Sequence, residues 1–206
     1  MAKLRMSWPN RITLARILLT CPFVIAMLYV NDEQYKPWAR YGAMTLFLVM
    51  AISDGLDGWL ARRNNTVSNW GAFLDPLADK LLIVCCCLLL ASDKAAIPGM
   101  KLPYVVVVII IGKDIYTILG FIIIYLVTSQ IKTVPVMMGK LSTMLQLSMV
   151  LAILISPEMK AILPRFEYLV QFLWWAAAVL AVFTMIIYTR NGTRYLNEYE
   201  HQQKHN

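Results

Sequence analysis

Apolar residues gather into six long runs along the chain, separated by short polar breaks. They cover residues 12–30, 38–60, 72–91, 104–127, 141–155 and 168–188. Each run is close to the roughly 20 residues that a helix needs to cross a bilayer, and the short fifth run is expected to start nearer Met137. Polar residues, prolines and glycines fill the breaks. The pattern predicts an all-α, polytopic membrane protein with six transmembrane helices. One integral domain over residues 1–190 would be followed by a polar tail over residues 191–206.

Composition supports a membrane protein and argues against a nucleic-acid partner. Hydrophobic residues make up 59% of the 206 residues, whereas soluble domains usually have about 45–50%. The net charge is +7, but we find no basic-aromatic platform, and cations that flank membrane helices account for the excess. Cys85, Cys86 and Cys87 are consecutive on an apolar run, about 100° apart around a helix, so they are expected to be buried apolar residues rather than metal ligands or disulfides.

The distribution of lysine and arginine predicts the orientation of the helices. These residues are more frequent at the helix ends on the side that carries both termini, where Arg11, Arg62 and Lys140 lie. Cytoplasmic loops carry such an excess. We therefore expect both termini, and the connection after residue 60, to lie in the cytoplasm. The first apolar run has no small-residue cleavage site after it and is expected to be a retained helix.

Four aspartates lie at helical spacings inside apolar segments, where an ionised carboxylate costs about 2.5–3.5 kcal/mol on insertion scales. Asp54 and Asp57 are three residues apart, and Asp75 and Asp79 are four apart, so each pair shares one helix face. Two helices joined by the short connection 63–70 would be antiparallel, so the two pairs can face each other. Four carboxylates suit hard cations such as Mg²⁺ or Mn²⁺ and supply enough oxygens for two ions.

Neighbouring residues favour an enzyme over two alternatives. Gly58 and Ala61 lack side-chain bulk, so a ligand could approach the helix, and Arg62 offers a fixed cation for a phosphate. A buried ion-pair network with Arg16, Lys80 and Lys113 is one alternative; a divalent-ion-binding transporter is the other. Neither explains why the acids cluster near one membrane face beside glycines and an arginine.

The aspartates belong to a longer pattern, Asp-x₂-Asp-Gly-x₂-Ala-Arg-x₈-Gly-x₃-Asp-x₃-Asp, which starts at Asp54 and ends at Asp79. It resembles the signature of the CDP-alcohol phosphatidyltransferase family at all eight fixed positions. The resemblance implies a membrane enzyme with a cytoplasmic site. In that family an alcohol hydroxyl attacks the lipid-side phosphorus of a CDP-linked lipid, and CMP leaves.

The resemblance also implies a role for each motif residue. Asp54, Asp57 and Asp75 would hold one metal ion, and Asp75 and Asp79 would serve a second. Asp79 would also be the catalytic base on the incoming alcohol. A homodimer is implied by the family alone. The residues implied in binding the CDP-lipid are Asn10, Thr13, Gly58, Ala61, Arg62 and Ser68.

Two further segments bear on the acceptor alcohol. Residues 9–16 resemble bacterial phosphatidylglycerophosphate synthases, which implies CDP-diacylglycerol and glycerol 3-phosphate as substrates in a bacterial inner membrane. Residues 139–146 resemble a segment that these enzymes share with CMP-forming cardiolipin synthases. Lys113-Asp114 departs from the Arg-Glu of many such enzymes and also resembles CMP-forming cardiolipin synthases, which use phosphatidylglycerol. Lys113 and Lys140 could form an acceptor-phosphate pocket. Alternatively, Lys113 pairs with Asp114 or with a motif aspartate. Inositol phosphate and serine remain as other acceptors.

Overall fold

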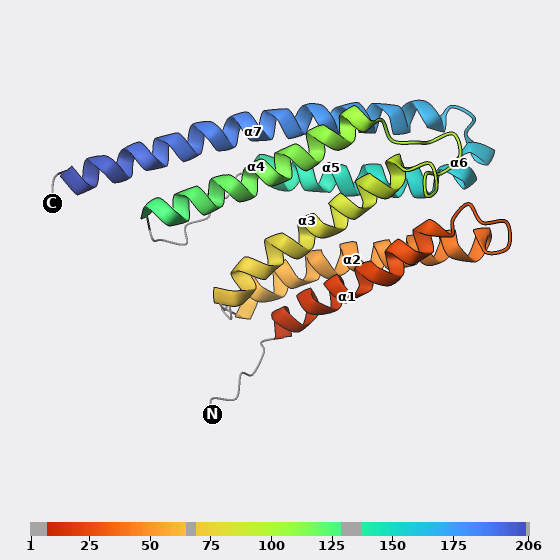
Figure 1. Ribbon diagram of the computed structural model, residues 1–206, viewed down its shortest axis with the longest axis horizontal. Coiled ribbons are helices and arrows are strands. Elements are labelled where there is room, and N and C mark those ends of the chain that lie inside the picture. The colour runs from red at the N-terminus through yellow and green to blue at the C-terminus, as the bar shows by residue number, and fades with distance from the viewer. Residues whose placement is uncertain (1–7, 65–68, 129–136, 205–206) are drawn as a thin grey trace. The chain divides into compact units, whose positions relative to one another are not determined.

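Every element in the described part of the chain is a helix. The computed structural model describes residues 8–64, 69–128 and 137–204, and it describes side chains within 13–35, 37–53, 80–120, 122–124, 126–128 and 138–197. The elements are α1 (Trp8–Leu28), α2 (Lys36–Asn64), α3 (Asn69–Ala91), α4 (Tyr104–Thr128), α5 (Met137–Leu154), α6 (Ser156–Ile162) and α7 (Phe166–Lys204) (Figure 1).

The helices form two compact units. The N-terminal unit comprises Met1–Leu102 and Val150–Glu167, so it holds α1, α2, α3, the end of α5, and α6. The C-terminal unit comprises Pro103–Met149 and Tyr168–Asn206, with α4, most of α5 and nearly all of α7.

In the N-terminal unit, α1 packs against both α2 and α3. Figure 1 shows α2 running in the opposite direction to α1 and α3. The buried residues of α1 and α2 recur at steps of three and four, which puts them on one face of each helix. We call these faces the α1 stripe and the α2 stripe. Their members are at most 5% exposed: Thr13, Arg16, Thr20, Phe23 and Met27 on α1, and Ala43, Phe47 and Met50 on α2.

Two contacts fix the register between these stripes. The rings of Phe23 and Phe47 have centroids 6.4 Å apart. The Thr20 hydroxyl lies 3.9 Å from the Met50 sulfur, to which it donates a hydrogen bond. A step of three residues back along α1 thus matches a step of three forward along α2, as antiparallel helices in constant register require.

At one end of the N-terminal unit, the connection between α3 and α4 folds inward. Pro98 and Gly99 form the centre of a tight turn closed by the Met100 amide donating to the Ile97 carbonyl (2.9 Å). Gly99 has φ +72°, which suits glycine at the third position of a type II turn. Asn31, after α1, donates from Nδ2 to the carbonyls of two residues of this connection, Lys94 and Ala96, at 2.9 Å each.

The break after the fifth apolar run contains a helix that the sequence pattern did not predict. There, α6 begins at Ser156 with Pro157 in its first turn, where the missing amide hydrogen costs nothing. The helices on either side of Ile155 are bent by 68°. The ion pair of Arg40 with Glu158 joins α6 to the start of α2, so this break is an ordered part of the unit.

In the C-terminal unit, α4 and α5 each make a close contact with α7. Figure 1 shows α4 and α7 running in the same direction, with α5 opposite to them. The Tyr116 and Thr189 hydroxyls share a hydrogen bond of 2.6 Å between α4 and α7. A Cβ on Gly139 would lie 2.9 Å from the hydroxyl oxygen of Tyr188, so glycine is what lets α5 lie this close to α7.

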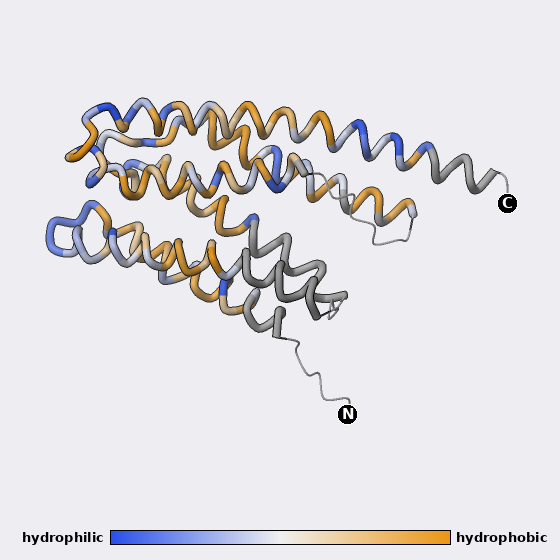
Figure 2. The backbone as a smooth tube through the Cα atoms, turned by 180° about the vertical axis from the view of Figure 1, so that it is seen from behind, coloured by the Kyte–Doolittle hydropathy of each residue, from blue (hydrophilic) through white to orange (hydrophobic). Residues whose placement is uncertain are grey.

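Two helices are long and apolar enough to cross a membrane among the described residues: Tyr104–Thr128 and the Phe166–Asn197 part of α7. A third is added if the bent pair of α5 and α6 counts as one span. Figure 2 shows apolar residues along these helices and hydrophilic residues at the connections. Large apolar side chains, such as Val108 (69%) and Phe172 (70%), face outward, as a lipid-facing surface requires. The finer prediction of six spans is not confirmed: among the described residues, Thr13–Leu28 and Lys80–Ala91 are shorter apolar stretches.

The Asn31 hydrogen bonds generate a stability prediction. Replacing Asn31 with Ala removes both bonds and should lower the free energy of unfolding by about 1–3 kcal/mol. Replacing it with Asp should cost more, because a carboxylate would face two carbonyl oxygens. Thermal unfolding in detergent measures both changes. The exposed neighbour Gln34→Ala is the control and should be neutral. Equal losses for the Ala and Asp variants would contradict the proposed donor role.

Candidate active site

The four motif aspartates lie on two continuous helices, close to the connection that joins them. Asp57 lies seven residues before the end of α2 and Asp75 six residues after the start of α3, which is about 10 Å and 9 Å along the helix axes. The two acidic pairs therefore lie at similar heights. Their side chains, like all others from residue 54 to 79, lie outside the described set.

Helical spacing relates the aspartate positions to the buried faces. The α2 stripe advances by steps of four and three through Met50, and the same steps continue to positions 54 and 57. On α3 the fully buried Leu90, Cys86 and Ile83 lead back by similar steps to positions 79 and 75. Both acidic pairs thus continue faces that pack inside the N-terminal unit.

The α1 stripe becomes polar at the same level. Phe23 and Met27 give way to Thr20, Arg16 and Thr13, which remain 5%, 3% and 1% exposed. The register set by the Phe23 and Thr20 contacts puts Arg16 level with position 54, and Thr13 level with position 57. Thr13, predicted to bind the CDP-lipid, therefore lies on the inner face of α1 near the motif.

The other predicted lipid-binding residues can be placed only by their elements. Gly58, Ala61 and Arg62 follow the first aspartate pair in α2, and Asn10 lies in the first turns of α1. Their side chains are not among those described, and Ser68 lies outside the described residues altogether.

The donor set fits a hard divalent cation. Four carboxylates on neighbouring turns of two connected helices offer only oxygen ligands, which Mg²⁺ and Mn²⁺ prefer. Among the side chains that the structure describes, no group of three His, Cys, Asp or Glu residues could hold a metal ion. The aspartates are not among those side chains, so the candidate metal centre stays a prediction based on helix placement and ligand chemistry.

The two lysines predicted to bind the acceptor phosphate have different surroundings. Lys113 is 2% exposed, and its Nζ lies 2.8 Å from the Asp114 carboxylate and 3.5 Å from the Gln146 side-chain oxygen. Gln146 donates in turn to the Ser142 hydroxyl at 3.4 Å. Of the two alternatives for Lys113, pairing with Asp114 is therefore present. Lys140 is exposed on α5.

The structure singles out two residues for which the sequence predicted no individual site role. Arg16 is the last residue of the 9–16 segment and was one of the possible ion-pair partners; it is nearly fully buried at the motif level. Gln146, quoted only as part of a family pattern, is fully buried and joins α5 to Lys113 of α4. The steps of three and four from Thr13 through Phe23 would have put Arg16 on an inner face.

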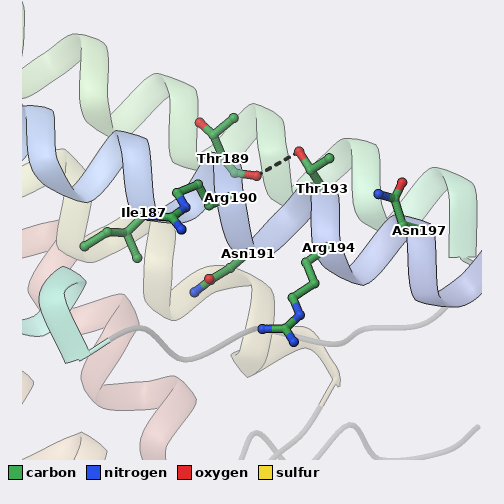
Figure 3. A pocket seen from close by; sticks show the side chains of 7 residues that line it. All are labelled: Ile187, Thr189, Arg190, Asn191, Thr193, Arg194 and Asn197. Carbon is green, nitrogen blue, oxygen red and sulfur yellow. Dashed lines mark hydrogen bonds between the residues drawn. The ribbon is translucent and has the colours of Figure 1, made fainter.

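A separate pocket of about 560 Å³ lies along α7, where its apolar part ends (Figure 3). No predicted site residue lines it. Arg190 and Arg194, one helical turn apart, are the charged groups in its lining, and the Thr193 hydroxyl donates to the Thr189 carbonyl at 2.9 Å. Arginines just past an apolar helix are typical of an anchor at the membrane surface.

The four cysteines are free thiols. The predicted burial is confirmed for Cys86 and Cys87 of α3, whereas Cys85 is partly exposed and Cys21 is exposed on α1.

Comparison with known proteins identifies the family. The chain is 35% identical over 155 residues to the CDP-diacylglycerol–glycerol-3-phosphate 3-phosphatidyltransferase of Bacillus subtilis, which covers 71% of this chain and 76% of that protein. Enzymes of the same name from Cereibacter sphaeroides (34% over 113 residues) and Escherichia coli (41% over 75 residues) match shorter stretches. These cover 54% and 36% of this chain, and 48% and 38% of the respective relatives. Residues 6–187 match the profile of the CDP-alcohol phosphatidyltransferases, so the chain belongs to the CDP-alcohol phosphatidyltransferase family.

Proposed function

We propose that this chain transfers the phosphatidyl group of CDP-diacylglycerol to glycerol 3-phosphate, giving phosphatidylglycerophosphate and CMP in phospholipid biosynthesis. One observation carries the proposal: the complete eight-position motif lies on the joined ends of α2 and α3 in a chain of this family. The similar relatives that carry the name of this reaction support glycerol 3-phosphate as the acceptor.

The proposed setting is a bacterial inner membrane crossed six times. Helices α1 to α5 and α7 would be the spans; the shortest, α5, has 18 residues, or about 27 Å, close to the roughly 30 Å of a hydrocarbon core. Residues 1–190 would form one catalytic domain, with the polar tail 191–206 beyond it. Both termini and the motif would face the cytoplasm, and the enzyme would act as a homodimer.

Two Mg²⁺ or Mn²⁺ ions would be held by the motif. Asp54, Asp57 and Asp75 would bind one ion, and Asp75 and Asp79 the other. When bound, the ions would neutralise the pyrophosphate and so lower its repulsion of the nucleophile. Asp54 and Asp57 lie one helical turn apart in a single helix, which limits their relative movement.

The remaining chemistry belongs to the chain itself. Asp79 would accept the proton of a glycerol 3-phosphate hydroxyl as its oxygen bonds to the lipid-side phosphorus. The bond from that phosphorus to the bridging oxygen breaks, and the electron pair leaves with CMP. The residues proposed to hold the CDP-lipid during the step are Asn10, Thr13, Gly58, Ala61, Arg62 and Ser68.

Lys113 and Lys140 are proposed to bind the acceptor phosphate, and their different surroundings suggest different roles in binding it. Lys140 is exposed on α5 and can reach a soluble ligand. Lys113 is held by Asp114 and Gln146, so it would act from a fixed position in the interface of α4 with α5.

An acceptor panel tests the function directly. Purified protein in mixed micelles with CDP-diacylglycerol and Mg²⁺ should release CMP with glycerol 3-phosphate. Phosphatidylglycerol, serine, inositol and inositol phosphate should give much slower release. Chelation should abolish release, and Mg²⁺ or Mn²⁺ should restore it. Preference for phosphatidylglycerol would make the chain a cardiolipin synthase, and no release with any acceptor would overturn the enzyme assignment.

The base assignment predicts a specific loss. Asp79→Asn should lower kcat by about 10²–10⁴-fold, because the amide cannot accept the hydroxyl proton. Asp93→Asn is the matched control: Asp93 is exposed, pairs with Lys101 and lies outside the motif, so its loss should leave kcat unchanged. CMP release at saturating substrates measures both. Wild-type kcat in the Asp79 variant would show that another group takes the proton.

Substitutions of Lys113 and Lys140 should differ in their effect on thermal stability. Lys140→Gln should raise KM for glycerol 3-phosphate without changing KM for CDP-diacylglycerol or the melting temperature. Lys113→Gln should also lower the melting temperature, because it leaves the buried Asp114 carboxylate uncompensated. The double variant Lys113→Gln, Asp114→Asn should regain stability while KM for glycerol 3-phosphate stays raised. An unchanged KM in the stable double variant would confine Lys113 to a structural role.

A further inference from the structure

The guanidinium of Arg16 is the most deeply buried cation that the structure describes in the N-terminal unit. Arg16 is 3% exposed, and it occupies the middle of the α1 stripe between Thr13 and Thr20. Its carbonyl accepts a hydrogen bond from the Thr20 hydroxyl at 3.0 Å, which ties the two residues into the same helix face. Burying an arginine in an apolar bundle is strongly unfavourable unless an anion lies beside it.

The described acidic side chains of this unit lie at its other end. A helix rises about 1.5 Å per residue, so Arg16 is roughly 24 Å from the acidic residues that follow α1. The rest belong to the connection after α3, to α6 and to the start of α7, and several already have cationic partners there. These acids are Asp32, Glu33, Asp93, Glu158 and Glu167.

The helix register points to a particular partner. Phe23 lies against Phe47 and Thr20 against Met50, so the next step along both stripes brings Arg16 level with Asp54. The following step brings Thr13 level with Asp57. Among the acids of α2, Asp54 is therefore the one that the packing of α1 on α2 assigns to Arg16.

We propose that Arg16 is a positioning residue of the metal centre, which pairs with the carboxylate of Asp54 and fixes the orientation in which that carboxylate meets a divalent cation. The pair would also offset part of the charge of four neighbouring acids while no cation is bound. Groups that hold metal ligands in this way commonly change metal affinity by 10–100-fold when they are removed. The inference rests on the proposed metal centre.

A double-mutant cycle in metal-free protein tests the pair without any catalytic readout. Arg16→Met and Asp54→Asn should each lower the melting temperature, by on the order of 10 °C, because each leaves one buried charge uncompensated. The double variant should recover most of that loss. If Arg16→Met does not fold, recovery of folded protein in the double variant is the expected result. A double variant no better than the worse single variant would overturn the pairing.

A control cycle distinguishes pairing of Arg16 with Asp54 from pairing with Asp57. The same cycle with Asp57→Asn should be nearly additive, since Thr13 rather than Arg16 lies at its level. Coupling to Asp57 and not to Asp54 would refute the assigned register. Because the cycle uses stability alone, it remains decisive even if wild-type protein releases no CMP with any acceptor, a result that would sink the proposed function instead.

Mn²⁺ affinity, measured by electron paramagnetic resonance, tests the positioning role. Arg16→Met should weaken binding by about 10–100-fold, and Arg16→Lys should regain part of it. Arg40→Met is a matched control, because Arg40 forms an ion pair with Glu158 in the same unit, away from the motif. It should lower stability and leave Mn²⁺ affinity unchanged. Unchanged affinity in both arginine variants would reduce Arg16 to a structural cation.

Discussion

The packing of the α1 stripe on the α2 stripe is the constraint on which the candidate site depends. Phe23 against Phe47 buries two large rings, whose apolar area contributes to holding α1 and α2 in a single register. A shift by one turn would remove that contact and the hydrogen bond from Thr20 to Met50 together. The same register then decides which polar residues of α1 meet the level of the aspartates. Apolar contacts in one half of the helix pair thereby set the electrostatics in the other half.

The two units place charge in an apolar environment in different ways. In the C-terminal unit Lys113 and Asp114 are adjacent in sequence and neutralise each other, with Gln146 and Ser142 completing a polar cluster between α4 and α5. The N-terminal unit has four motif acids near one level and one deeply buried arginine among its described residues. An ion pair within the chain offsets its own charges, whereas four clustered acids favour cations from solution.

Residue spacing in the sequence predicted the features that a single helix determines. It did not predict the features that depend on how several helices pack. The aspartates fall on continuous α2 and α3 because the steps of three and four are a property of the helix itself. The burial of Arg16 follows from which face of α1 packs inward, and its level follows from the register with α2, which a single sequence does not contain. For Lys113 the sequence left two partners open, and the ion pair with Asp114 is present. Pro157 after Ser156 is a recognisable helix start, but a seven-residue helix is too short to show periodicity.

The fully buried layers of Phe23, Phe47, Met27 and Ala43 have a consequence for the movement of substrates. They occupy the helix pair on the side of the aspartates that faces away from the α2–α3 connection. Charged, water-soluble molecules are disfavoured in these apolar layers. If transfer takes place at the level of the aspartates, glycerol 3-phosphate would approach them, and CMP would leave, from the side of the α2–α3 connection.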